Sequence, residues 1–215
     1  MKKSLRLPVV IVCLSLLLLY CRKEQKAQVP DNNFLLEITV EDGTDLLIDS
    51  VQVIMYDHSS QEIKKEIIAE VPFERGNFTA PLPMQIDAEF LFPLNTLWMI
   101  NDDCSVKMSP SIHFLAYYQD EYVGIISGCY THQDAEGTVY LHFCDCDFRK
   151  QECVSPYLNE PDYTADFNYD LSCRKGWNYI YSHVRYSDDN HSSTVTTEDP
   201  GNLIWQFQPV AQFFE

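Results

Sequence analysis

The sequence predicts an all-β body, and the fold class that we expect is an antiparallel β-sandwich. Hydrophobic residues make up 46% of the 215 residues and aromatic residues 13%, which supplies enough apolar surface for a sizeable core. Tyrosine and phenylalanine are abundant, with 13 and 12 copies, and both favour strands. Short stretches alternate between apolar and polar residues, whereas runs with the 3.6-residue period of an amphipathic helix are scarce.

The first 20 residues predict a lipoprotein signal peptide. A basic opening through Arg6 precedes an apolar run from Leu7 to Leu19, and Cys21 stands at its border. The run is shorter than the roughly 20 apolar residues that a spanning helix requires. Tyr20 departs from the small residue that usually precedes a lipidated cysteine. We expect cleavage before Cys21 and acylation of its thiol by palmitate-like chains, which hold a protein on a membrane without a spanning helix.

The mature chain then has two parts. Residues 21–33 are polar and predict a flexible tether, and residues 34–215 predict the β-sandwich body, with an internal boundary near residue 101 if two β subdomains pack together. The net charge of −17 becomes −20 once Lys2, Lys3 and Arg6 leave with the signal. An anionic body is repelled by phosphate backbones, which argues against nucleic acid as a partner.

Most of the body is expected to be strands joined by turns. A hairpin turn at Glu74-Arg75-Gly76 favours a strand over a helix in the run before it. Pro81 is expected to end the next strand, because proline cannot donate to a ladder. A crossover with a helical turn is expected over residues 84–93, and a second short element over 94–100. The expected strands of this half are 34–40, 50–56, 63–73 and 77–79.

The second half continues the pattern toward an immunoglobulin-like or related sandwich. Gly124 and Gly128 are expected to allow close packing of a hairpin. Residues 144–170 have little periodicity and predict a long loop that cysteines hold in place. The expected strands are 112–118, 122–127, 138–144, 177–184, 194–197 and 203–207.

Six cysteines lie beyond the expected lipidation site, all in the second half of the chain. An even number of cysteines in an exported protein predicts disulfides, and six cysteines allow 15 connectivities, which the sequence leaves open. The disulfide candidates are Cys104, Cys129, Cys144, Cys146, Cys153 and Cys173.

Two weaker patterns concern metals. His142, Cys144 and Cys146 are two residues apart on an expected strand, so their side chains share one face, and Cys153 is a candidate fourth ligand for a tetrahedral metal. The alternative, which export favours, is that the cysteines are oxidised. The acidic region from Cys144 to Cys173 offers oxygen ligands for calcium, with a solvated surface as the favoured alternative. We therefore predict no metal site and no cofactor.

Catalytic motifs are missing from the sequence. It has no Gly-x-Ser-x-Gly elbow and no His-Glu-x-x-His helix, so the expected protein is not an enzyme. The aromatic excess admits a flat platform for stacking sugars, against the alternative that these rings fill the core of the sandwich. The platform candidates are Trp98, Trp177, Trp205, Tyr117, Tyr118, Tyr179 and Tyr181.

Three short motifs carry a resemblance to a known family. They are Pro72-Phe73-x-x-Gly76-x-Phe78-Thr79, Lys175-Gly176-Trp177-Asn178-x-Ile180-Tyr181 and a final Trp205. Together they resemble a family of uncharacterised exported lipoproteins of Bacteroides and its relatives in the Bacteroidota. The resemblance implies a β-rich exported body and brings no catalytic residues. The cysteine richness departs from that family.

The sequence as a whole predicts a lipid-anchored protein of the cell envelope, on the periplasmic or the surface side of the outer membrane. Its expected function is a non-enzymatic structural or interaction module, and whether its partner is a protein or a glycan is left open. The alternative is a glycan-binding lipoprotein, and a metal-dependent enzyme or metal carrier is a distant third. The ligand-binding residues are left open.

Overall fold

The computed structural model describes residues 33–57, 64–98, 100, 106–132, 135–155, 164–187 and 190–210. The expected signal peptide, Cys21, Cys104 and the expected boundary near residue 101 lie outside these ranges. From Asn33 onward the described chain belongs to one compact unit. No helix in the described ranges has both the length and the hydropathy needed to span a membrane.

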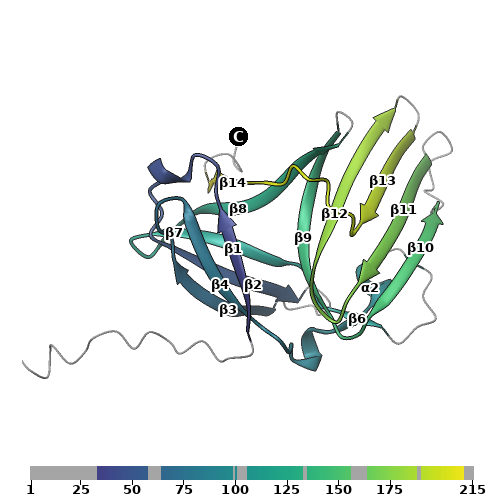
Figure 1. The fold of residues 1–215 in the computed structure, drawn as a ribbon, viewed down its shortest axis with the longest axis horizontal. Helices are drawn as coiled ribbons and strands as arrows, with labels where there is room; N and C mark the ends of the chain where they lie inside the picture. The colour runs from purple at the N-terminus through teal and green to yellow at the C-terminus, as the bar shows by residue number, and fades with distance from the viewer. Residues whose placement is uncertain are drawn as a thin grey trace, which may run out of the picture. The chain divides into compact units, whose positions relative to one another are not determined.

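The fold is all-β, as the sequence predicts, and it is consistent with a β-sandwich (Figure 1). The helical elements named within the described ranges are α2 (Leu94–Leu97) and two 3-10 turns, Gly43–Asp45 and Ala88–Phe90. The strands are β1 (Asn33–Thr39), β2 (Ser50–Asp57), β3 (Lys64–Pro72), β4 (Asn77–Pro83), β5 (Phe92–Pro93), β6 (Lys107–Met108), β7 (Ile112–Tyr118), β8 (Glu121–His132), β9 (Ala135–Cys144), β10 (Phe148–Val154), β11 (Thr164–Cys173), β12 (Gly176–Ser187), β13 (Asn190–Thr196) and β14 (Ile204–Pro209).

One large sheet contains most of the strands, in the order β10-β11-β13-β12-β9-β8-β7-β2-β3. Its pairs are antiparallel except β11 and β13, which run parallel. The long strand β8 joins two halves: β14 pairs with its residues Gly124–Cys129, while β7 and β9 follow one another along its other edge. In Figure 1, β8 accordingly reaches from β7 toward β9.

A two-stranded sheet of β1 and β4 forms the second layer over β2 and β7. Alternate side chains of these four strands meet in the main core, which includes Leu36, Phe78, Val53 and Phe114. The strand β4 continues through Pro81 to Pro83, so the expectation that Pro81 ends it is wrong. Proline is tolerated because β1 is the one described strand that pairs with β4. No strand on the other edge of β4 needs a backbone N–H from it.

Two glycines of β8 lie so close to neighbouring strands that a side chain would not fit, as the sequence predicts for Gly124 and Gly128. A Cβ on Gly124 would lie 2.3 Å from the carbonyl oxygen of Gln208, and one on Gly128 would lie 2.1 Å from Val139 Cγ1. Gly76 adopts φ +82° in the hairpin turn between β3 and β4, a conformation that strongly favours glycine. The turn therefore forms where the sequence places it.

The expected long loop over residues 144–170 is wrong in large part. Its described residues form β10 and most of β11, which pair in antiparallel register from Phe148 opposite Cys173 to Val154 opposite Phe167. The strand β10 is at the edge of the sheet, where its exposed side chains are Arg149, Gln151 and Cys153 and the charged Lys150 and Glu152 occupy half-buried positions. This composition hid the alternation that predicts a strand.

Candidate functional site

Of the seven aromatic residues proposed for a flat platform, one is buried and six are half-buried. Trp177 donates a hydrogen bond from Nε1 to the carbonyl oxygen of Pro83 at 2.8 Å, and Trp205 packs edge-on against Phe114 with ring centroids 5.4 Å apart. Tyr181 is buried, and Tyr179 packs partly buried against the main core. Alternating strand positions turn these rings toward the interior, which agrees with the favoured interpretation that they help to fill the core.

The four residues of the weak metal candidate are not brought together. His142 and Cys144 are buried on β9, whereas Cys153 is exposed on the edge strand β10. The Nδ1 of His142 is 2.8 Å from the carbonyl oxygen of Ser109. Within the described ranges, no group of three or more His, Cys, Asp or Glu side chains is arranged to hold a metal ion.

Two carboxylates of the acidic region hold the backbone of neighbouring segments. Asp145 accepts a hydrogen bond from the backbone N–H of Lys107 at 2.9 Å, and Asp147 accepts one from that of Lys175 at 2.6 Å. These acids therefore tie the starts of β6 and β12 to the turn after β9. Asp145 and Asp147 thus accept hydrogen bonds from backbone N–H groups of neighbouring segments.

No disulfide joins any two of the five cysteines that the structure describes. Cys144 and Cys173 are buried, Cys129 and Cys146 are half-buried, and Cys153 is exposed. The sixth disulfide candidate, Cys104, lies outside the described residues.

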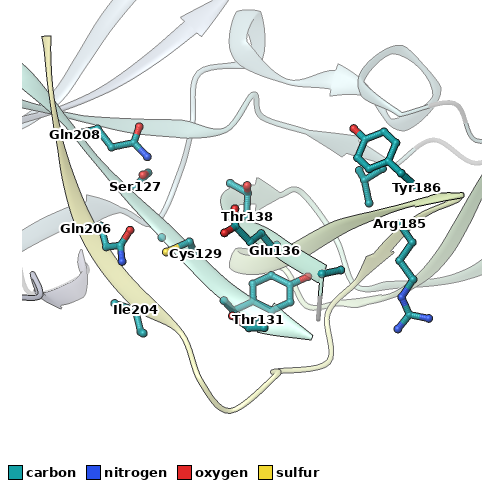
Figure 2. Close-up of a pocket in the computed structure, with 15 residues that line it drawn as sticks. Ser127, Cys129, Thr131, Glu136, Thr138, Arg185, Tyr186, Ile204, Gln206 and Gln208 are labelled. Atoms are coloured by element: carbon teal, nitrogen blue, oxygen red, sulfur yellow. The ribbon is translucent and has the colours of Figure 1, made fainter. Parts of the chain in front are cut away.

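A polar groove crosses the face of β14, β8 and β9 and has a volume of about 930 Å³. Its floor follows from strand alternation, because every second side chain of a strand points to the same face. The register places Ile204, Cys129 and Thr138 in one row across the three strands, and Gln206 opposite Ser127 in the next. Figure 2 shows Gln206 and Gln208 on one side of this groove and Arg185 and Tyr186 of β12 on the other.

The groove offers both donors and acceptors of hydrogen bonds. Gln206 donates from Nε2 to the Glu41 carboxylate at 3.2 Å, which fixes its amide with the carbonyl oxygen left to accept. Glu136 and Thr138 are exposed on β9. The Tyr186 side chain is 80% exposed, so its ring is available at the rim for stacking.

Cys129 lies on the floor of the groove but is poorly suited to act as a nucleophile. Burial raises the pKa of its thiol, and the nearby carboxylates of Glu136 and Glu41 raise it further. The thiolate is the reactive form of cysteine, and at neutral pH this side chain stays protonated. The groove therefore combines hydrogen-bonding side chains with a thiol that stays protonated.

A smaller cavity of about 370 Å³ lies on the opposite face of β8 and β12. It contains His132 and His183, whose ring centroids are 4.8 Å apart, and Tyr130, whose hydroxyl is 3.2 Å from Nδ1 of His183. Burial lowers the pKa of His183, and His132 and Arg185 lower it further, which favours the neutral ring. This histidine acts as a partner for a buried tyrosine.

The groove was not predicted from the sequence. Its side chains come from four strands that are distant in the chain, and each is an ordinary polar residue of an alternating strand. The only signal was the alternation of residues 203–207, which marks Gln206 as outward-facing but does not show which strands lie beside it. A scan of protein-family models, a search of curated proteins and a search of solved structures each found no match to this chain.

Proposed function

We propose that this chain is a non-enzymatic lipoprotein of the cell envelope, anchored through Cys21, whose β-sandwich body binds a ligand in the polar groove. The observation that carries the binding proposal is the groove itself: about 930 Å³ lined by exposed polar side chains of β14, β8, β9 and β12. Anchoring is supported by the basic opening, the apolar run and the border cysteine of residues 1–21.

A non-enzymatic role is supported by the chemistry of the groove. Its thiol, Cys129, has a raised pKa, which disfavours the nucleophilic form. Its carboxylate, Glu136, is exposed to solvent on β9. These groups suit recognition by hydrogen bonds better than the transfer of a proton or an acyl group.

A neutral glycan is the ligand class that the groove favours. Sugar hydroxyls donate and accept hydrogen bonds, which matches the amides of Gln206 and Gln208 and the hydroxyls of Ser127 and Thr138. The exposed ring of Tyr186 offers a face for a sugar ring. Glu136 and Glu41 at the groove and the net charge of −17 for the full chain disfavour acidic polysaccharides.

The anchor is tested by metabolic labelling with an alkyne-bearing palmitate analogue. We expect label on the wild-type protein and none on the Cys21→Ser variant. A wild-type chain that takes no label, or a variant that keeps it, would contradict lipidation at this residue.

The ligand class is tested by affinity electrophoresis in native gels that contain soluble polysaccharides. We expect at least one neutral polysaccharide to retard the purified protein and alginate, an acidic one, to leave its mobility unchanged. Unchanged mobility in every neutral polysaccharide of the panel would reject a glycan and favour a protein partner for the same groove.

A further inference from the structure

The thiols of Cys144 and Cys173 lie in direct contact within the core. Cys144 ends β9 and Cys173 ends β11, and their side chains are 0% and 3% exposed. A hydrogen bond joins the two thiols. Both belong to one apolar cluster with Met108, Leu171 and Ile180, so no solvent separates the two sulfurs.

The fold brings these residues together through two ladders that meet at one end of the sheet. Gly176, which opens β12, is opposite Cys144, and Cys173 precedes it by only three residues. Phe148, which opens β10, is opposite Cys173 and follows Cys144 by only four residues. The ladder between β9 and β12 therefore ends at Cys144, close to Cys173 in the chain, and the ladder between β10 and β11 ends at Cys173, close to Cys144 in the chain.

We propose that Cys144 and Cys173 are partners in a disulfide bond when the chain folds under oxidising conditions. Of the 15 connectivities that six cysteines allow, three contain this bond. The other described cysteines are placed differently, because Cys129 lies in the groove and Cys153 is exposed on the edge strand β10.

The bond forms by thiol–disulfide exchange with a small or protein-borne disulfide as the oxidant. The Cys144 thiolate attacks the oxidant, whose S–S bond breaks and releases one thiolate, and a mixed disulfide results. The Cys173 thiolate then attacks the Cys144 sulfur and releases the second thiolate. The two protein thiols lose two electrons and two protons, and the oxidant is reduced to two thiols.

Exchange takes place before the strands close over the pair. The hydrogen bond with Cys173 and burial raise the pKa of Cys144 in the folded state, which removes its thiolate, and the cluster excludes an oxidant. The bond would close a loop of about 30 residues that contains β10 and β11, and loops of this length stabilise a fold of this size by about 5–10 °C in Tm.

The test uses the full chain, reduced, unfolded and refolded with a mixture of reduced and oxidised glutathione. Free thiols are alkylated under denaturing conditions, and a chymotryptic digest is analysed by mass spectrometry without reduction. We expect a linked pair of peptides that contain Cys144 and Cys173. The link should persist in Cys146→Ser, whose serine lies on the same peptide as Cys144, and in Cys153→Ser, and it should be lost in Cys144→Ser.

The second readout is thermal unfolding of the refolded protein with and without a reductant. We expect reduction to lower the Tm of the wild type and of Cys153→Ser by about 5–10 °C, and to leave the Tm of Cys173→Ser unchanged. Alkylation of both thiols after oxidative refolding, or a link that passes through Cys146, would overturn the proposal. Because the oxidant is supplied, neither result depends on export or on what the groove binds.

Discussion

The two ends of β9 present the same face of one strand to very different surroundings. Near its start, Glu136 and Thr138 are exposed side chains that line the polar groove. Further along the same alternation, His142 and Cys144 are 5% and 0% exposed beneath Trp98 and Met108. The strand pattern is continuous, and only the covering segment differs.

The difference shows that a covering side chain decides whether this face becomes core or stays open to solvent, where we propose that the ligand binds. Trp98, which follows α2, packs over the second end of β9, with its ring 5.5 Å from the His142 ring and its Nε1 3.5 Å from Met108 Sδ, while β6 pairs with β9 at Met108 opposite Cys144. The first end has no such cover among the described residues. We therefore expect substitutions at the covered end to change the free energy of unfolding and substitutions at the open end to change ligand affinity.

The largest expected effect comes from removing the cover. Trp98→Ala should lower the free energy of unfolding by about 3 kcal/mol, because a large half-buried ring loses its contacts with His142, Tyr169 and Met108. Urea unfolding measures the change, and glycan retardation of the folded variant should remain that of the wild type. Weakened retardation without a loss of stability would mean that the two ends are not independent.

Acid should also act on the covered end. Burial lowers the pKa of His142 from 6.5 to about 4, a hydrogen bond with the Ser109 carbonyl opposes this shift, and His113 adds to it. The folded state then binds fewer protons than the unfolded state between these values. Stability is complete above about pH 6.5 and falls as the pH drops toward 4, by about 2–3 kcal/mol in total.

The contribution of His142 is isolated by comparing wild type with His142→Asn. Carboxylates titrate in both proteins, so the difference between their unfolding free energies from pH 7.5 to 4 reports the histidine. The variant should lose less stability over this range. Parallel curves for the two proteins would contradict the lowered pKa.

At the open end the expected effect is on binding. Gln206→Ala should weaken glycan affinity by about tenfold, since a hydrogen bond to the ligand is lost, with little change in stability. Gln52→Ala is a matched control: this strand glutamine also donates to a glutamate, Glu70 at 3.0 Å, but lies outside the groove. Equal affinities in the two variants would remove Gln206 from the binding surface.

The smallest predicted effect is at the rim. Tyr186→Ala should reduce affinity by about threefold, because an exposed ring contributes stacking at the edge of the site. Tyr122→Ala, which removes an exposed ring 5.9 Å from Tyr117 and outside the groove, should leave the affinity unchanged. Isothermal titration with the retarding polysaccharide measures both. A larger loss for Tyr122 would place the ligand elsewhere.

The same contrast explains what the sequence predicted well. Alternation and turn chemistry are local, so the strands of residues 50–57 and 77–79, the Arg75-Gly76 turn and the close approach at Gly124 follow from neighbouring residues. The continuation of β4 through Pro81 and the strands β10 and β11 were missed. Their pairing depends on which edges remain free, and a single chain segment does not contain that information.

The candidate site was largely beyond the sequence for a related reason. The row of Ile204, Cys129 and Thr138 joins residues that are up to 75 positions apart, and only the register of three strands reveals it. Trp205 and Trp177 were plausible sugar platforms by composition, yet their alternation places them toward the core. The contact between Cys144 and Cys173 likewise required the order of the strands.

The most direct test of the groove as the binding surface is to fill it. Thr138→Trp adds a large ring at an exposed position of the floor, in a strand that favours aromatic residues. Thr79→Trp makes the same change at an exposed threonine of β4. We predict that affinity electrophoresis in the retarding neutral polysaccharide shows no retardation of Thr138→Trp and full retardation of Thr79→Trp. Full retardation of a folded Thr138→Trp protein would contradict the central claim.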